Sequence, residues 1–190
     1  MKKTLHLIII SIALHLPLYA QNISNEEYLE IENKTSVLFD ILRQANDNMQ
    51  AEHFQNALNA YSIIADSTKQ KRIKFEKQVW FFSQIGMASC YYQLGQNEKG
   101  YKLCEQLLKE QLSDDDIILV QDRLVANGVC WAIDMMLNRQ YAKARELLKE
   151  MRPLAKGEFK QSILRYLPRS WYMEGAEYEL KQKYDEAHHV

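Results

Sequence analysis

Small residues recur along this chain at an almost constant interval. Ala57, Gly100, Ala144 and Ala187 are separated by 43, 44 and 43 residues, and each follows an aromatic or polar residue three positions earlier. A period of this length is typical of stacked supersecondary units, each of which buries its apolar face against its neighbours. The period therefore predicts a solenoid, an architecture that is better suited to binding a partner than to chemistry of its own.

The apolar positions around these small residues have helical spacing. Between Phe54 and Ile64, apolar residues occur at positions 54, 57, 58, 61 and 64, which is the pattern of a half-buried helix. The same stripe returns at 101–108 and 141–151, and we expect each of these three segments to be the second helix of a pair. Longer first helices are expected at 69–94, 114–137 and 158–180, with Pro168 interrupting the last one. The pattern predicts an all-α fold built from helix pairs.

Polar residues mark the boundaries between these helices. Turns are expected at 95–97 and 138–140, and Ser113 with Asp116 has the spacing of a capping box at the start of a helix. The acidic run at 114–116 favours the positive end of a helix dipole. Because this run lacks the alternating spacing and the glycine of a calcium loop, we predict a helix start there and no metal site.

The last unit carries the most complete repeat signature. Trp171, Gly175, Tyr178, Tyr184 and Ala187 have the spacing of a tetratricopeptide repeat, and the chain resembles that family of helix pairs. The resemblance implies a right-handed α-solenoid of antiparallel helix pairs, with three complete units and a truncated fourth in residues 37–190. Earlier units match in part, at Ala45, Phe54, Ala57 and Tyr61, at Ala88, Tyr91, Leu94 and Gly95, and at Tyr141 and Ala144. Small residues at 88, 132 and 175 are expected to let helices approach closely, with Tyr61, Tyr91 and Tyr178 beside them.

Two features depart from the family pattern. The period is about 43 residues, where the family usually has about 34, and no unit ends with the family's closing proline. The additional residues are expected to lengthen the connection after each second helix and the first helix that follows. The chain is similar in this respect to the long-helix scaffolds of bacterial regulators and signalling proteins.

The resemblance also implies which residues face a partner, because the family uses the inner face of its first helices. Either these residues line an apolar groove for a peptide or helix, in which the polar ones bond to the partner's backbone, or several of them are ordinary core. Transferred by register, they are Phe39, Leu42, Asn46, Met49, Phe82, Ile85, Ser89, Tyr92, Val129, Ile133, Met136 and Tyr172, together with Ala126, Arg169, Ala176 and Glu179.

The N-terminal segment has the pattern of a secretory signal peptide. Lys2 and Lys3 precede an apolar stretch from Leu5 to Leu18, and Ala20 provides a small residue for cleavage. We expect residues 1–20 to be removed, residues 21–36 to form a polar lead-in, and the protein to be periplasmic or extracellular. The remainder would hold 22 basic and 25 acidic residues, a balance that argues against nucleic-acid binding, and no later segment is apolar enough to span a membrane.

Three cysteines, Cys90, Cys104 and Cys130, follow the predicted cleavage site. An odd number leaves at least one thiol unpaired, and we expect the cysteines to be small buried residues on helix faces. A disulfide between Cys90 and Cys104 is the alternative, since both fall in one repeat.

The sequence contains no pattern typical of an active site. It has no glycine-rich phosphate loop, no histidine pair at zinc spacing and no Cys-x-x-Cys, so we expect neither catalysis nor a cofactor. The predicted function is an exported scaffold that binds a protein or peptide. The alternatives are the sensor ectodomain of a longer bacterial kinase or transcriptional regulator, and the repeat domain of a caspase-like protease. A helix pair cut short at Val190 leads us to expect that the natural chain continues.

Overall fold

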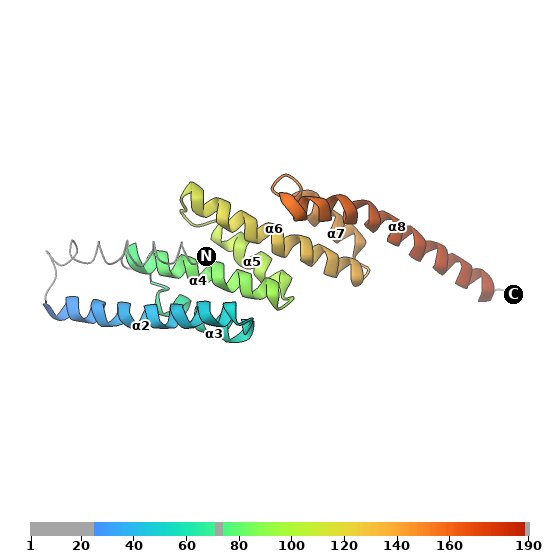
Figure 1. Cartoon of the computed structure of the whole chain (residues 1–190). Coiled ribbons are helices and arrows are strands. Elements are labelled where there is room, and N and C mark those ends of the chain that lie inside the picture. Colours follow the sequence, from blue (N-terminus) through green and yellow to red (C-terminus); the bar gives the residue numbers. More distant parts are fainter. Residues whose placement is uncertain (1–24, 71–73, 189–190) are drawn as a thin grey trace. The chain divides into compact units, whose positions relative to one another are not determined.

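A computed structural model describes residues 25–70 and 74–188. The described residues form helices and contain no strand, so the chain is all-α in these ranges (Figure 1). The predicted signal peptide lies outside the described residues. The helices are α2 (Asn25–Gln50), α3 (Phe54–Ser67), α4 (Lys74–Gln93), α5 (Asn97–Leu107), α6 (Asp114–Leu137), α7 (Tyr141–Met151) and α8 (Gly157–His188).

Most predicted helices occur where the apolar periodicity places them. Helices α6 and α7 have the predicted bounds, whereas α5 begins earlier than expected, at Asn97. Helix α2 begins at Asn25, so most of the polar lead-in belongs to this helix. Ser113 caps α6 as predicted, because its Oγ accepts a hydrogen bond from the Asp116 backbone N–H and donates one to the Asp116 carboxylate.

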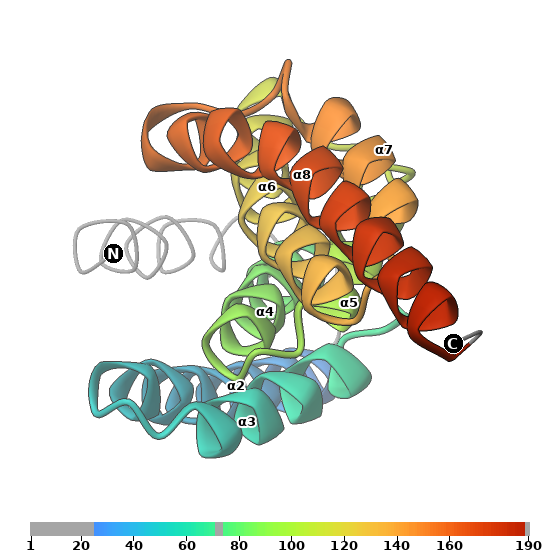
Figure 2. The same ribbon diagram turned by 90° about the vertical axis from the view of Figure 1, so that its right-hand side faces the viewer.

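Helix α8 differs from the prediction at two places. It continues through Pro168, and it also continues to His188, where a turn and a new helix were expected after residue 181. Proline removes one backbone donor but can remain in a helix that bends, and Figure 2 shows α8 changing direction along its length. Residues 181–184 contain no glycine, proline or asparagine that would end the helix.

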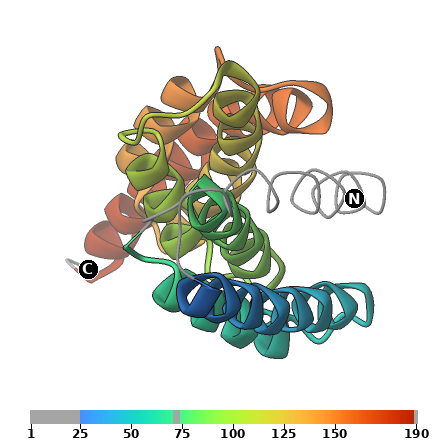
Figure 3. The ribbon, with the colours of Figure 1, turned by 90° about the vertical axis from the view of Figure 1, so that its left-hand side faces the viewer.

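The chain forms two compact units, and the boundary between them falls inside α4, after Ser83. In the first unit, α2 packs against α3, as Figure 3 shows for the blue and teal helices. The Tyr61 hydroxyl donates a hydrogen bond to Oδ1 of Asn46 across this pair, at 3.0 Å. The ring of Phe75, at the start of α4, lies 5.6 Å from that of Phe39 on α2.

The second unit is a succession of packed helices. Helix α5 packs against α6, α6 against α7, and α7 against α8, and α6 also contacts α8 (Figure 2). The Asn127 side chain is fully buried and joins α6 to the second part of α4, since its Nδ2 donates a hydrogen bond to the Ala88 carbonyl at 3.2 Å. The unit is therefore held together by adjacent helix pairs along the chain.

Three of the recurring small residues, Ala57, Gly100 and Ala144, are points of close helix contact. Ala57 and Ala144 are fully buried, and a Cβ added to Gly100 would lie 2.0 Å from Oδ1 of Asn127. The same role was expected at Ala88, Ala132 and Gly175. It is confirmed at the two alanines, which are fully buried, but wrong at Gly175, around which a Cβ would meet nothing within 4 Å.

The turns inside the helix pairs recur with the same period. A residue with positive φ occurs at Glu52, Gly95 and Arg139, again 43 and 44 positions apart. In each turn the following backbone N–H donates a 2.8 Å hydrogen bond to the carbonyl five residues earlier, which is the bond that closes a Schellman motif. The turns of the three helix pairs α2–α3, α4–α5 and α6–α7 thus repeat in backbone geometry, although only one of these turns has glycine at the left-handed position.

The structure bears on two further predictions, one about the cysteine thiols and one about membrane-spanning segments. Cys104 is a free, fully buried thiol, which excludes the alternative disulfide with Cys90 in this structure. Burial raises the pKa of both thiols to about 12, so they remain protonated at neutral pH. Among the described helices, none is both long and apolar enough to cross a bilayer.

Candidate functional site

Five of the residues predicted to line a groove belong to the core. They are all buried, and they are Leu42, Ile85, Ala126, Val129 and Met136. Their side chains present almost no surface to a partner in this structure. At these positions the structure agrees with the alternative interpretation, in which the residues are ordinary core.

The two short polar residues of the predicted groove are already hydrogen-bonded within the chain. Asn46 donates through Nδ2 to the Leu42 carbonyl at 2.8 Å and accepts from Tyr61. The Ser89 hydroxyl donates to the Ile85 carbonyl of its own helix at 2.9 Å. These hydrogen bonds use many of the side-chain donors and acceptors that were expected to bind the backbone of a partner.

The remaining predicted positions keep some exposed surface. Tyr172 on α8 is the most exposed of the hydrophobic ones, with 77% of its surface accessible. Tyr92 lines a separate pocket and packs its ring edge-on against Phe159, with 6.4 Å between the ring centroids. Those that are partly exposed are Phe39, Met49, Phe82, Ile133 and Ala176, whereas Arg169 and Glu179 are exposed.

Tyr172 lines a cavity in the second unit. This cavity, which we call the α8 groove, has a volume of about 650 Å³ and runs between α8 and the turn that joins α6 to α7. Its apolar part comes from α8 residues spaced four apart, with Tyr141 of α7 opposite them. The groove residues are Arg139, Tyr141, Tyr172, Met173, Ala176, Glu177, Leu180 and Lys181.

Two of the apolar side chains in the α8 groove are largely exposed. Tyr172 is 77% and Leu180 is 69% exposed. Tyr172, Ala176 and Leu180 occupy one flank of α8, because each residue lies one turn after the last. Leucine and tyrosine side chains left this open, on the rim of a concave surface, are typical of sites that another molecule covers.

Charged side chains form one edge of the groove. Nη1 of Arg139 lies 3.3 Å from Oε1 of Glu177, and Nζ of Lys181 lies 3.2 Å from the same oxygen. The hydrogen bond from Lys181, assisted by the Arg139 charge, lowers the pKa of Glu177, so this carboxylate stays ionised. Two cations around one anion leave this edge with a net positive charge.

The opposite flank of α8 is anchored to α7. The guanidinium carbon of Arg145 lies 3.7 Å from the centroid of the Trp171 ring, and Nη1 lies 2.7 Å from Oε2 of Glu174. The second contact is an ion pair whose geometry is not that of a well-aligned hydrogen bond, since Nη1 has no hydrogen-bond partner in the described part of the chain. The buried arginine therefore orients α8 and with it the groove.

The groove was only partly predictable. The repeat register identified Tyr172 and Ala176, but Met173, Leu180 and the charged edge were missed. Leu180 could have been found from its spacing, because it lies four residues after Ala176 on the same helix face. The second helix expected to cover this face does not form within the described residues, since α8 continues to His188.

In the described segments, no group of three or more His, Cys, Asp or Glu residues could hold a metal ion. Comparison of the chain with protein-family models, with curated proteins and with solved structures finds no match. The function must therefore be inferred from the geometry of the groove.

Proposed function

We propose that this protein is an interaction module of tetratricopeptide-like helix pairs, arranged as a right-handed solenoid, which binds an amphipathic helical peptide in the α8 groove. The observation that carries the proposal is the exposed apolar stripe of Tyr172, Ala176 and Leu180 beside a cavity of about 650 Å³. The stripe would receive the apolar face of the peptide, whose anchors would recur at helical spacing.

The recurring turns support the repeat part of the proposal. Three left-handed turn residues and three buried small residues share one period, as expected for successive copies of one helix-turn-helix unit. In this arrangement each short second helix covers the long first helix that precedes it. The α8 groove is the place where such cover is incomplete among the described residues, and a partner helix would complete it.

The charged edge favours an acidic residue on the partner. Arg139 and Lys181 are both more than half exposed and share a single carboxylate, so one cationic charge remains uncompensated. An aspartate or glutamate next to the apolar anchors of the peptide would meet this charge at the rim of the groove. We propose that the protein binds its partner without catalysing a reaction. We also propose that it is exported and that residues 1–20 are removed.

The proposal predicts that substitutions in the groove weaken peptide binding. Peptides would be selected against the whole chain from a displayed library of amphipathic helices, and their affinities would be measured by fluorescence polarisation. Tyr172→Asp or Leu180→Asp is expected to weaken a selected peptide at least tenfold, or about 1.4 kcal/mol, because a carboxylate would replace an apolar contact.

Tyr178→Asp is the matched control for this experiment. Tyr178 lies on the same helix and is similarly exposed, but it is not part of the groove. All three substitutions are at exposed positions, and circular dichroism is expected to show helical content unchanged in each variant. Equal loss of affinity in the control, or no loss in either groove variant, would contradict the proposal.

A further inference from the structure

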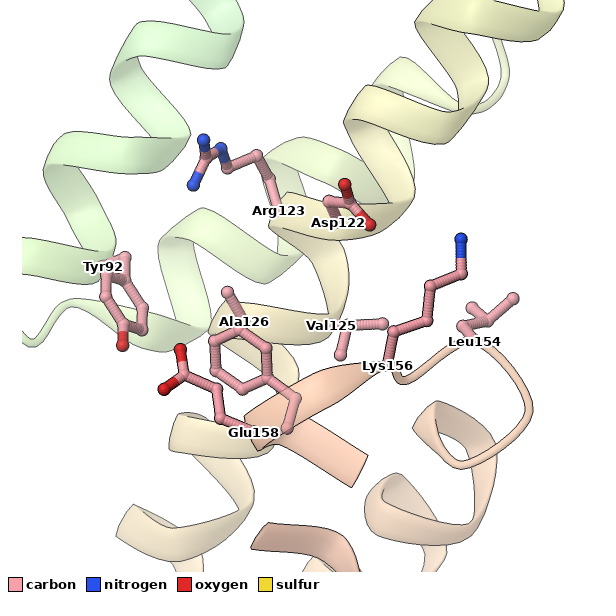
Figure 4. A pocket seen from close by; sticks show the side chains of 9 residues that line it. Tyr92, Asp122, Arg123, Val125, Ala126, Leu154, Lys156 and Glu158 are labelled. Carbon is pink, nitrogen blue, oxygen red and sulfur yellow. The ribbon is translucent and has the colours of Figure 1, made fainter. Parts of the chain in front are cut away.

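A second pocket, smaller than the α8 groove, lies within the second unit. It has a volume of about 310 Å³ and is bounded by the end of α4, the middle of α6 and the chain leading from α7 into α8 (Figure 4). The residues that line it are Tyr92, Asp122, Arg123, Val125, Ala126, Leu154, Lys156, Glu158 and Phe159. This volume is at the lower end of the range for ligand pockets, which points to a small ligand.

One part of this pocket is apolar. Val125 and Ala126 are buried on α6, and Leu154 lies on the connection after α7. The Tyr92 and Phe159 rings meet edge to face, with an interplanar angle of 82°. An aliphatic or aromatic group of a ligand could pack against these side chains.

Four charged side chains line the same pocket, two of each sign. Asp122 and Arg123 are adjacent on α6, and Lys156 and Glu158 lie near the start of α8 (Figure 4). Although they share one small pocket, none of the four forms an ion pair with any residue that the structure describes. Charges of both signs are therefore available to a ligand.

Arg123 is also incompletely hydrogen-bonded. Its Nε is buried and has no acceptor among the described residues. A guanidinium with an unused donor is best satisfied by a carboxylate, which can accept two parallel hydrogen bonds. The arginine therefore points to an anionic group on the ligand.

The carboxylate of Glu158 points to a cationic group. It lies close to the Tyr92 hydroxyl (Figure 4). Burial, followed by the nearby Cys130 and Glu158, raises the pKa of Tyr92, so the hydroxyl remains protonated and can donate. An ammonium group could be held by Glu158, with Asp122 as the second carboxylate in the lining.

We propose that this pocket binds a free α-amino acid with an apolar side chain. The carboxylate of the ligand would pair with Arg123 or Lys156 and its ammonium with Glu158 or Asp122, while its side chain packs on the apolar surface. A ligand with one charge would satisfy only half of the charged lining. A zwitterion satisfies both halves and remains neutral overall, which limits the cost of placing charge in a small pocket.

The proposal is tested by calorimetry on the whole chain with three ligands that share the leucine side chain and differ in which end is charged. L-leucine is the zwitterion, N-acetyl-L-leucine keeps the carboxylate alone, and L-leucinamide keeps the ammonium alone. Leucine is expected to bind at least tenfold more tightly than either blocked form. L-valine and L-phenylalanine extend the test to other apolar side chains. Equal binding of the zwitterion and a blocked form, or no saturable binding of any of the three amino acids, would overturn the proposal.

Charge-neutral variants assign the two ends of the ligand. At least one of the variants Arg123→Gln and Lys156→Gln is expected to weaken leucine and N-acetyl-leucine at least fivefold and to leave leucinamide unchanged. At least one of the variants Glu158→Gln and Asp122→Asn is expected to weaken leucine and leucinamide at least fivefold and to leave N-acetyl-leucine unchanged. Lys156 and Glu158 are exposed, so these two variants should fold even if Arg123→Gln does not. Lys143→Gln, on the exposed face of α7, is the control and should change no affinity. Uniform losses across all three ligands would contradict the assignment.

Discussion

Replacing Gly100 with alanine is expected to lower the free energy of unfolding by about 3 kcal/mol. The new Cβ would lie 2.0 Å from Oδ1 and 2.4 Å from Cγ of Asn127, so the amide would have to move. Movement would strain or break the hydrogen bonds from Asn127 to the carbonyls of Ala88 and Arg123. Because Asn127 is fully buried, water would not replace these bonds. Urea unfolding followed by circular dichroism measures the change.

Gly175→Ala is the matched control for that substitution. The same chemical change is made in a helix, but a Cβ at Gly175 meets nothing within 4 Å. Alanine has the higher helix propensity, so this variant is expected to gain about 0.5–1 kcal/mol. Opposite signs at the two glycines follow from the structure, whereas a similar effect at both would show that Gly100 is not a point of close helix contact.

Arg145→Ala is expected to cost about 2 kcal/mol of stability and to loosen α8 from α7. The substitution removes the stacking of the guanidinium on Trp171 and leaves the Glu174 carboxylate without its partner. The cost stays below that of a fully buried pair because the Glu174 side chain is 26% exposed and can be partly hydrated. Chemical unfolding gives the stability, and hydrogen exchange of α8 amides reports the loosening.

A double-mutant cycle with Glu174→Ala isolates the ion pair from the stacking. If the pair contributes as described, Arg145→Ala should cost less in the Glu174→Ala background than in the natural chain. Lys143→Ala, a change at an exposed lysine on the same helix, should stay within about 0.5 kcal/mol of the natural chain. Additive effects of the two substitutions would mean that Arg145 acts through Trp171 alone.

The helices could be predicted from apolar spacing because each one buries a single face. The stripe from Tyr141 to Met151 defines α7 at both ends, and a capping serine defines the start of α6. The continuation of α8 through Pro168 could not be predicted, since whether a proline ends or only bends a helix depends on the packing around it. A turn was predicted at 138–140, but the left-handed conformation of Glu52 and Arg139 was not, because neither residue prefers that backbone conformation.

The candidate site was less predictable than the helices. The repeat register places a residue on a helix face, but it does not say how deeply that face is covered. Met136 and Tyr172 were assigned to the same inner surface, yet Met136 is 3% exposed and Tyr172 is 77% exposed. The pocket around Arg123 brings together side chains from three parts of the chain, and no local pattern connects them.

The most direct test of the proposed function is to map where a selected helical peptide binds. A peptide from the displayed library, carrying one benzophenone group on its apolar face, would be photo-cross-linked to the whole chain, and the modified residues would be identified by mass spectrometry. The account predicts cross-links at Tyr172, Met173, Ala176 and Leu180, which are lost when excess unlabelled peptide competes. Cross-links that fall mainly in α2 or α3, or that resist competition, would contradict the assignment of the α8 groove as the binding surface.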